Sequence, residues 1–315
     1  MGPAPGRTAG IPQLTLVLLG TGARWPTPER GVAAAMVMRG ADHLLIDCGE
    51  GTQRQMMLSR PGLRRLRAVL VTHCHADHVL GLPGLLATLS ETRHDDLPIL
   101  GPPGLGALVA AFRAQVGPLS FGLDVRETAP GEGLVRDGYR IEAVEARHDC
   151  PALGWVVAED PLPGHLDPAA LLARGVGPGP GRARLAGGEA LGAVEPGEVS
   201  GPGRRGRRLV YSGDTRPAPG IAAAAAGADL LVHEATFLEA DRDLAARAGH
   251  STAAQAAALA ARAGVGLLAL THRSSRYPRE QVLAEARAVF APVVVPSDLD
   301  AIEVPLPERG PPVLV

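Results

Sequence analysis

The sequence has no lysine and no asparagine, only three cysteines, and aromatic residues at 3% of its 315 positions. So few cysteines do not suggest a disulfide framework, and we therefore expect a reducing, cytoplasmic environment. No apolar run reaches the length of a membrane span, and residues 1–10 lack the apolar core of a secretory signal, so we expect a disordered tail there. The net charge of −2 gives no general affinity for nucleic acid, so any RNA-binding site has to be a local patch.

Apolar segments typical of strands alternate with segments that favour helices, which predicts an α/β fold. The expected strands include 14–19, 33–38, 43–46 and 68–71, and the expected helices include 52–58, 85–91 and 278–290. Several strands end in polar residues, as in "YSGDT", "LVHEATF" and "LTHRSS". Because sites in α/β proteins assemble at strand ends, we expect the functional site at these tips.

The stretch from 160 to 207 is rich in proline and glycine and offers a single helix candidate, 168–173. A segment this long without a hydrophobic core of its own is usually either a functional protrusion or disordered, and the residues alone leave both alternatives open. Its end is rich in arginine, which we interpret as a solvated charge run rather than a basic patch: Arg204, Arg205, Arg207 and Arg208.

The strand expected at 68–71 ends in "THCHADH". His73 and His75 are two residues apart, so in an extended chain both imidazoles face the same side. Asp77 and His78 follow where the chain turns into a helix. Imidazole and carboxylate suit zinc and similar divalent ions. Ligands this close in sequence can hardly enclose one ion, so we expect two adjacent ions that share further ligands.

Further ligand candidates stand at the ends of other expected strands: His148, Asp214 and His272. The two oxygens of a carboxylate such as Asp214 can each take one ion. Two ions about 3.5–4 Å apart generate hydroxide near neutral pH and neutralise charge on a phosphoryl or acyl oxygen. The spacing therefore predicts a dinuclear metallohydrolase and leaves its substrate open. The same donors also accommodate manganese or iron.

The remaining histidines and the cysteines are interpreted as structural. The histidines without ligand-like neighbours are expected on the surface or in loops: His43, His94 and His165. The cysteines are expected to be packed rather than coordinating: Cys48, Cys74 and Cys150.

The order of the motifs resembles the metallo-β-lactamase superfamily and, within it, the ribonuclease Z family of tRNA 3′-processing endonucleases. The resemblance spans residues 14 to 305 and rests on "LGTGA", "DCGEGTQ", "THCHADHVLGLPGLL", "YSGDTR", "LVHEATF", "HST" and "LTHRSSRY". The histidine motif is specific for the superfamily only, whereas "HEATF" followed by "HST" is much more specific for ribonuclease Z. The resemblance implies an αββα sandwich over residues 11–315, with two zinc ions at one edge of the sheets.

The resemblance also implies a role for each matched residue. The ligands of one zinc ion would be His73, His75 and His148, those of the other Asp77, His78 and His272, and the bridging ligand Asp214. Asp77 would in addition accept the proton of the attacking water. His250, supported by Glu234, would protonate the leaving 3′ oxygen, because an imidazolium held by a carboxylate is a competent acid near neutral pH.

Three further implications concern positioning and substrate binding. Asp47 resembles a carboxylate that orients a ligand histidine. The proline- and glycine-rich insertion, at about 160–190, resembles the flexible arm with which the family grips the tRNA body, and Arg182 and Arg184 in "GPGPGRAR" would contact the RNA backbone. Arg276 would contact a substrate phosphate. Since the arm reaches RNA held by the other subunit in family members, the resemblance also implies a homodimer.

The sequence departs from the family pattern at several places. The arm lacks the usual lysines, and "RWPTPERGVAA" after "GTGA" differs from the usual loop near the cleft. The leading hypothesis is therefore a zinc endoribonuclease that removes the 3′ trailer from precursor tRNA and leaves a 3′ hydroxyl. The alternatives are a small-molecule phosphodiesterase or arylsulfatase of the same fold, and a non-catalytic RNA-binding protein, which would need neither His250 nor Glu234.

Overall fold

The computed structural model describes residues 11–59 and 62–315, so the tail expected at 1–10 lies outside the described residues. Within these ranges the strands form one eight-stranded and one seven-stranded sheet. The chain divides into two compact units. The larger contains Gln13–Ala158 and Arg207–Val315, and the smaller contains Glu159–Gly206.

The first sheet belongs to the larger unit. Its strands are β1 (Leu14–Gly20), β2 (Ala34–Arg39), β3 (Asp42–Ile46), β4 (Leu66–Leu70), β5 (Leu97–Gly101), β6 (Leu123–Glu127), β14 (Ala301–Val304) and β15 (Val313–Leu314). The order across the sheet is β15-β14-β1-β2-β3-β4-β5-β6. Strands β3 to β6 are parallel. The helices that connect them are α1 (Thr52–Leu58), α2 (Ala76–Val79), α3 (Leu82–Ser90) and α4 (Leu105–Val116).

The second sheet completes the larger unit. Its strands are β7 (Gly133–Arg136), β8 (Tyr139–Glu145), β9 (Leu153–Glu159), β10 (Arg208–Tyr211), β11 (Leu230–Glu234), β12 (Leu267–Thr271) and β13 (Val293–Val294), in the order β13-β12-β11-β10-β9-β8-β7. Strands β10 to β13 are parallel. The helices that connect them are α7 (Pro219–Ala225), α8 (Arg242–Ala248), α9 (Ala253–Ala263) and α10 (Arg279–Val289).

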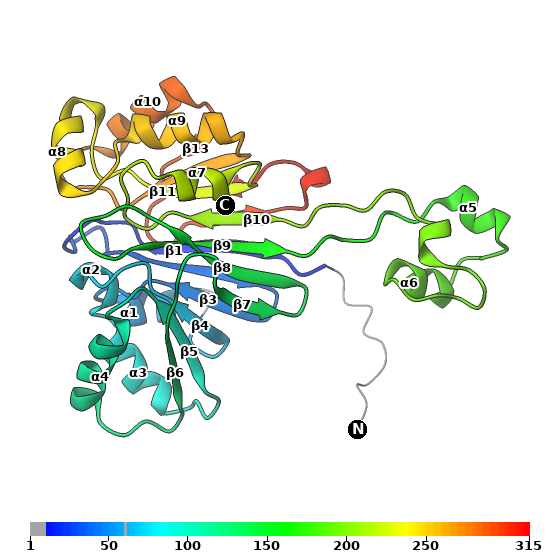
Figure 1. Ribbon diagram of the computed structural model, residues 1–315, viewed down its shortest axis with the longest axis horizontal. Helices are drawn as coiled ribbons and strands as arrows, with labels where there is room; N and C mark the ends of the chain where they lie inside the picture. Colours follow the sequence, from blue (N-terminus) through cyan, green and yellow to red (C-terminus); the bar gives the residue numbers. More distant parts are fainter. Residues whose placement is uncertain (1–10, 60–61) are drawn as a thin grey trace. The chain divides into compact units, whose positions relative to one another are not determined.

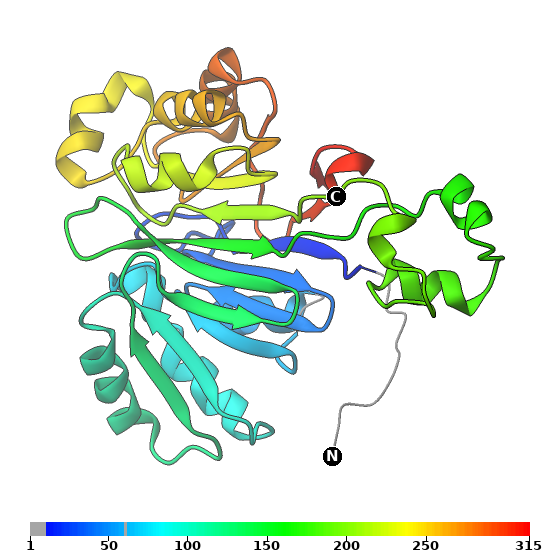
Figure 2. The ribbon, with the colours of Figure 1, turned by 45° about the vertical axis from the view of Figure 1, so that its right-hand side comes forward.

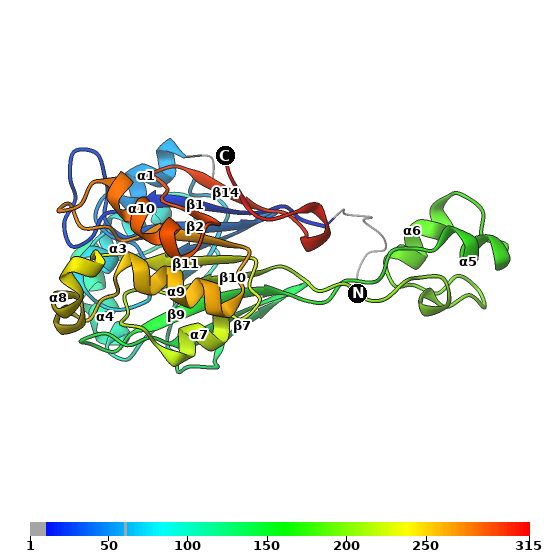
Figure 3. The same ribbon diagram turned by 90° about the horizontal axis from the view of Figure 1, so that it is seen from above.

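The two sheets of the larger unit face each other between outer helices, which confirms the predicted αββα sandwich (Figures 1 and 2). The cluster between the sheets is almost fully buried and includes Leu16, Ile46, Trp155 and Val232. A second cluster packs α1, α3 and α4 on the first sheet, and a third packs α7, α9 and α10 on the second. Helix α9, for example, lies against β11 and β12 (Figure 3). Apolar burial on both faces explains why inner strands such as β1, β11 and β12 are nearly continuous hydrophobic runs.

The structure corrects the local geometry of the histidine motif. The strand expected at 68–71 is present as β4, but it ends at Leu70 and α2 begins at Ala76, so His73 and His75 lie between the two elements. The backbone amide of Thr72 donates to Oδ1 of Asp47 at 2.7 Å rather than to a neighbouring strand. Because the carboxylate of Asp47 accepts this amide, the hydrogen bonding between strands ends here and the chain turns, so the two histidines lie in a loop.

Two other expectations about polar residues are wrong. His43 lies inside β3 and is only 3% exposed, rather than on the surface or in a loop, because β3 is an inner strand that is covered on both faces. Arg207, expected in a solvated charge run, is 3% exposed and donates from Nη1 to the carbonyl of Val304 at 3.0 Å.

The smaller unit has a core of its own, which the sequence did not lead us to expect. Its helices are α5 (Pro168–Ala173), at the predicted position, and α6 (Pro180–Ala186), which was not predicted. Leu171, Val176, Leu185 and Val199 form its buried cluster. The unit also extends beyond the expected limits of 160–190. Among the described residues of the whole chain, no helix combines the length and apolarity that crossing a membrane requires.

Candidate metal centre and active site

The side chains predicted as metal ligands converge at one edge of the two sheets. One group follows β4 and lies in the loop and in α2: His73, His75, Asp77 and His78. The other group follows β8, β10 and β12 of the second sheet: His148, Asp214 and His272. Because β10 and β12 are parallel, their carboxyl ends reach the same edge. Residues from positions 73 to 272 thus form overlapping clusters that are able to hold metal ions, among them His73, His78 and Asp214, and Asp77, His78 and His272.

The carboxylate of Asp214 lies in the middle of these side chains. Its Oδ2 is 3.2 Å from Nε2 of His272 and 3.4 Å from Nε2 of His78. The same oxygen is 3.8 Å from Nε2 of His73. On the far side, Oδ2 of Asp77 is 3.3 Å from Nε2 of His272. Ligands about 2.0–2.2 Å from one ion are separated from each other by distances of this kind. Asp214 is therefore placed to bridge the two groups.

The imidazoles of His73, His75 and His148, the predicted ligands of one ion, form a compact face. Nδ1 of His75 is 3.3 Å from Nε2 of His148. The ring of His73 lies 4.6 Å from that of His75 and 4.9 Å from that of His148, measured between centroids. The ring of His73 meets the rings of His75 and His148 edge to face, with interplanar angles of 78° and 71°, so these rings do not stack in parallel.

Asp47 fixes the orientation of His78, as the resemblance implied. Its Oδ2 accepts a hydrogen bond from Nδ1 of His78 at 2.7 Å and another from Oγ1 of Thr72 at 2.8 Å. A carboxylate only accepts, so Nδ1 of His78 carries the proton and Nε2 presents its lone pair to the group. Asp47 is 0% exposed, so this interaction is shielded from water.

Two other ligand histidines are held in the same manner. Nδ1 of His148 donates to the carbonyl of Gly249 at 2.8 Å, and Nδ1 of His272 lies 2.9 Å from Oγ1 of Thr236. In each case the outer nitrogen is occupied and the inner nitrogen, Nε2, faces the other ligands. This arrangement fixes the ring tautomer and is the usual support of a metal-bound imidazole.

His73 provides an independent indication that the residues fit a cation. Its side chain is 0% exposed, and Nε2 has no hydrogen-bond partner among the described residues. A buried acceptor without a partner costs about 1–3 kcal/mol, which a divalent cation at this position would offset. Burial, reinforced by neighbouring His78, holds the pKa of His73 well below its ordinary value, so the ring is in the neutral form that binds metals.

The carboxylates and imidazoles of the centre stabilise each other's charged forms. Burial would lower the pKa of His78, but Asp214 and Asp47 outweigh it and raise the pKa well above its ordinary value. Burial would likewise raise the pKa of Asp214, but His272 and His78 hold it well below its usual range. These directions describe a buried site that attracts positive charge, which is the electrostatic property that a pair of divalent cations requires.

His250 and Glu234 form a separate pair beside the ligands. Nδ1 of His250 donates to Oε1 of Glu234 at 2.9 Å. Burial lowers the pKa of His250, but the Glu234 carboxylate outweighs burial and raises the pKa to about 9. His250 is therefore an imidazolium at neutral pH. Oγ1 of Thr236 donates to Oε2 of Glu234 at 2.6 Å, so the carboxylate is fixed from its other side.

His250 and five of the predicted ligands border one hollow of about 550 Å³; these ligands are His75, Asp77, His148, Asp214 and His272. Asp77, His148 and His250 line it, and so does Arg276, the arginine predicted to contact a phosphate. Arg276 is exposed, so its guanidinium is accessible to a bound anion. The hollow combines ligand atoms, a charged acid and a cation, which suits a phosphodiester.

Arg182 and Arg184 belong to the smaller unit and lie on α6. The guanidinium of Arg182 donates to the carbonyls of Val176 and Gly177 at 3.1 and 3.2 Å. Nε of Arg184 lies 3.0 Å from a carboxylate oxygen of Glu189. Both pairings are at the surface, where such interactions contribute little, so neither arginine is committed to its partner.

Sequence reasoning missed three groups at the centre. Thr236 contacts both Glu234 and His272, and its place in "HEATF" was the available signal. Oδ1 of Asp149 lies 3.1 Å from Nε2 of His148, and Cys150 adjoins the same group although it was expected to be packed. Their position directly after a ligand, in "RHDC", could have indicated this proximity.

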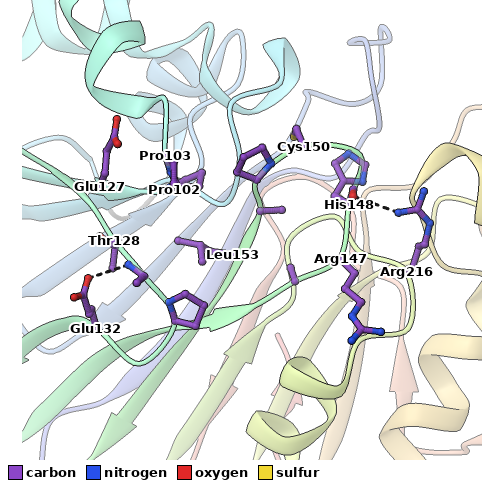
Figure 4. A pocket seen from close by; sticks show the side chains of 15 residues that line it. Pro102, Pro103, Glu127, Thr128, Glu132, Arg147, His148, Cys150, Leu153 and Arg216 are labelled. Carbon is purple, nitrogen blue, oxygen red and sulfur yellow. Dashed lines mark hydrogen bonds between the residues drawn. The ribbon is translucent and has the colours of Figure 1, made fainter.

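A second hollow, of about 850 Å³, adjoins the first and shares His148 with it. Figure 4 shows Leu153 in its middle, with Glu127 on one side and Arg216 on the other. Apart from His148 it holds none of the predicted ligands. We therefore place the chemistry in the smaller hollow.

Comparison with known proteins gives the same picture. A family model described as a β-lactamase superfamily domain matches residues 42–165 and 196–273. A ribonuclease Z of Methanosarcina acetivorans is 41% identical over 300 residues, which cover 93% of this chain and 98% of the relative. A ribonuclease Z of Halorubrum lacusprofundi is 43% identical over 309 residues, covering 94% and 98%.

A solved structure agrees with these sequence matches. The short form of human tRNase Z superimposes with a TM-score of 0.68 at 27% identity, covering 93% of this chain and 100% of that chain. The similarity extends through both sheets and is not confined to the ligand motif.

Proposed function

This chain belongs to the ribonuclease Z family of the β-lactamase superfamily, and we propose that it is a zinc-dependent endoribonuclease that removes the 3′ trailer from precursor tRNA, leaving a 3′ hydroxyl. The observation that carries the proposal is the His250–Glu234 pair beside the ligand groups. A ribose 3′ oxygen is a poor leaving group unless it is protonated as the bond breaks. An acid held in the charged form supplies that proton.

Two groups of side chains would hold the metal ions. We propose His73, His75 and His148 for one ion, and Asp77, His78 and His272 for the other, with Asp214 between them. The close approach of Asp77, His78 and His272, and that of Asp214 to His73 and His78, support this assignment. When bound, the pair of zinc ions supplies Lewis-acid activation of water and of the phosphate. The imidazole and carboxylate donors fit zinc and also accommodate manganese or iron.

The chain's own acid and base complete the reaction. Asp77 accepts the proton of the attacking water, the water oxygen bonds to phosphorus, and the bond from phosphorus to O3′ breaks. His250 gives its proton to O3′, so the products are a 3′ hydroxyl and a trailer with a 5′ phosphate. Glu234 keeps His250 charged and oriented, and its own position is fixed by Thr236. Arg276 binds a phosphate at the rim of the hollow.

The smaller unit is proposed as the arm that binds the tRNA body, with Arg182 and Arg184 on α6 contacting RNA phosphates. Arginine forks bind phosphates without reading bases, so these contacts raise affinity and not specificity. Exchanging both for alanine is expected to raise the KM for precursor tRNA several-fold and to leave hydrolysis of bis(p-nitrophenyl) phosphate unchanged. Arg262→Ala, an exposed arginine of the larger unit, is the control.

We further propose a cytoplasmic homodimer, in which the arm of one subunit reaches RNA on the other. Sedimentation of the purified protein at several concentrations measures the assembly. A monomer at all concentrations that still cleaves tRNA would overturn this part of the proposal alone.

Cleavage of a 3′-extended tRNA transcript by the metal-loaded protein tests the main proposal. The products are sized on a gel, and their ends are identified by ligation and phosphatase treatment. Asp77→Ala and His250→Ala are expected to lose activity, whereas His94→Ala, an exposed histidine outside the hollow, retains it. A metal-loaded protein that does not cut the transcript, or that cuts equally well as Asp77→Ala, excludes the proposal.

A further inference from the structure

Trp25 is an unusual surface residue in this chain. The sequence contains two tryptophans, three tyrosines and four phenylalanines. Trp155 is 0% exposed in the core, whereas Trp25 is 54% exposed. Among the exposed large hydrophobic residues of the described chain, it is the only aromatic one. It lines the hollow that also contains Asp77 and His250.

The backbone next to Trp25 is hydrogen-bonded to Asp77 and to the segment that follows β12. The amide of Arg24 donates to Oδ2 of Asp77 at 2.7 Å, and the amide of Ala23 donates to the carbonyl of Arg273 at 3.2 Å. Arg24 adopts φ 71°, a left-handed conformation that a non-glycine residue rarely adopts. Strained residues of this kind persist where the surrounding structure over-determines them, commonly at binding sites.

The charge near the indole suits a nucleotide. The guanidinium carbon of Arg24 lies 6.0 Å from the centre of the Trp25 ring. Arg276 borders the same hollow and is exposed. An exposed aromatic face with cations beside it is the arrangement on which unpaired bases stack while their phosphates are neutralised.

We propose that Trp25 is a base-stacking platform that positions an unpaired nucleotide adjoining the scissile phosphate. This inference rests on the proposed function, since it assigns the indole to the RNA strand that crosses the hollow. Stacking is tolerant of sequence because every base has a flat face. The platform therefore places the strand relative to Asp77 without selecting a particular base, which suits trailers of varied sequence.

The test combines variants of the protein with variants of the substrate. The substrates are a 3′-extended tRNA and two versions with one abasic residue, placed either directly 5′ or directly 3′ of the cleaved bond. Trp25→Ala is expected to lower kcat/KM on the intact substrate by roughly 5- to 150-fold, the range for one lost stacking contact. One abasic substrate should lower the wild-type value similarly and lower that of Trp25→Ala little further, because both changes remove the same contact. The side of the sensitive abasic residue identifies the stacked nucleotide.

Three controls separate stacking from a structural role. Trp25→Phe keeps an aromatic face and should retain most of the activity. Met57→Ala removes an exposed side chain that does not line the hollow and should match the wild type. Metal binding by Trp25→Ala, measured by competition with a chelator, should be unchanged, since the indole is not among the predicted ligands.

Fluorescence gives a readout that does not depend on turnover rates. Because Trp155 is buried, quenching by acrylamide should report Trp25, and bound RNA should protect it from the quencher. In Trp25→Phe the remaining emission comes from Trp155 and should be insensitive to both acrylamide and RNA.

The outcomes distinguish this inference from the proposed function. If wild-type protein cuts tRNA but Trp25→Ala equals it, or if the losses from Trp25→Ala and both abasic substrates are additive, the platform is refuted and the endonuclease stands. Weaker metal binding by Trp25→Ala also refutes it, because the effect then acts on the centre itself. If wild-type protein cuts no tRNA, the proposed function fails first.

Discussion

Exchange of Asp47 for asparagine tests how the buried hydrogen bonds prepare the ligands. Oδ1 of Asp47 accepts the amide of Thr72, which the asparagine carbonyl can also do, so the turn after β4 should be preserved. The other oxygen accepts from Nδ1 of His78 at 2.7 Å. The asparagine NH₂ at this position donates, and two donors then face each other. The conflict is relieved when His78 moves its proton to Nε2, the nitrogen needed for the metal.

The expected size of the effect follows from that single interaction. A hydrogen bond to a charged group contributes about 1.5–3 kcal/mol. Loss of such a partner typically weakens metal binding by roughly 10- to 100-fold, which is about 1.4–2.7 kcal/mol. The two ranges agree, so under the proposed two-zinc centre we expect Asp47→Asn to lower the affinity for the ion held by His78 by one to two orders of magnitude.

Competition with a chromophoric chelator measures this affinity and the number of ions bound. Urea unfolding of the metal-free protein, measured in parallel, shows whether the turn is intact. Asp124→Asn, an exposed carboxylate on β6 that pairs with Arg126, serves as the control and should bind zinc as the wild type does. If Asp47→Asn binds two zinc ions with unchanged affinity, the reasoning from the tautomer of His78 is wrong.

Three further predictions use the same preparations. Gly249 has φ 84°, and in Gly249→Ala the new Cβ would lie 2.7 Å from Nδ1 of His148, so metal affinity should fall in the chelator titration. The control is Gly227→Ala, with φ 63° and open space around the new Cβ. It should lose stability without changing metal binding. Because Glu234 raises the pKa of His250 to about 9, the proton is present below that pH and is lost above it. Glu234→Gln should therefore move the basic limb of kcat/KM to lower pH by about one unit or more, and an unshifted limb would contradict the acid role. Removal of the metal ions by a chelator should lower the thermal midpoint reversibly, with recovery that depends on the concentration of added zinc. A midpoint that is insensitive to zinc would show that the ions do not bind the folded chain preferentially.

The sequence is informative about the convergence of ligands because two simple rules act together. Strands are recognisable from their apolar runs, and polar tips on parallel strands have to meet at one edge. Asp214 and His272 are each more than fifty residues from any neighbouring ligand in the chain, yet the ends of β10 and β12 bring them within 3.2 Å. The helix at 168–173 was predicted from local residues alone. Its beginning is also determined locally, since the side chain of Asp167 caps the helix by accepting the amide of Ala169.

Features that depend on tertiary contacts were not accessible in this way. The chain turns between β4 and His73 because Asp47, distant in sequence, accepts the amide of Thr72. His43 is buried because β3 became an inner strand, which its own five residues do not reveal. Helix α6 and the cluster around Leu185 form in a segment whose glycines and prolines argue against regular structure. In each case a partner elsewhere in the chain outweighs the local preference.

The origin of the ligands in two different sheets has a consequence for how the protein matures. One sheet offers only half of the donors, so a nascent or partly open chain has no complete cage for an ion. Metal binding therefore depends on correct folding, since only a molecule whose two sheets have packed together presents the full set of ligands. Under the proposed function, a shortage of the metal ion would leave folded but inactive molecules that regain activity once the ion returns.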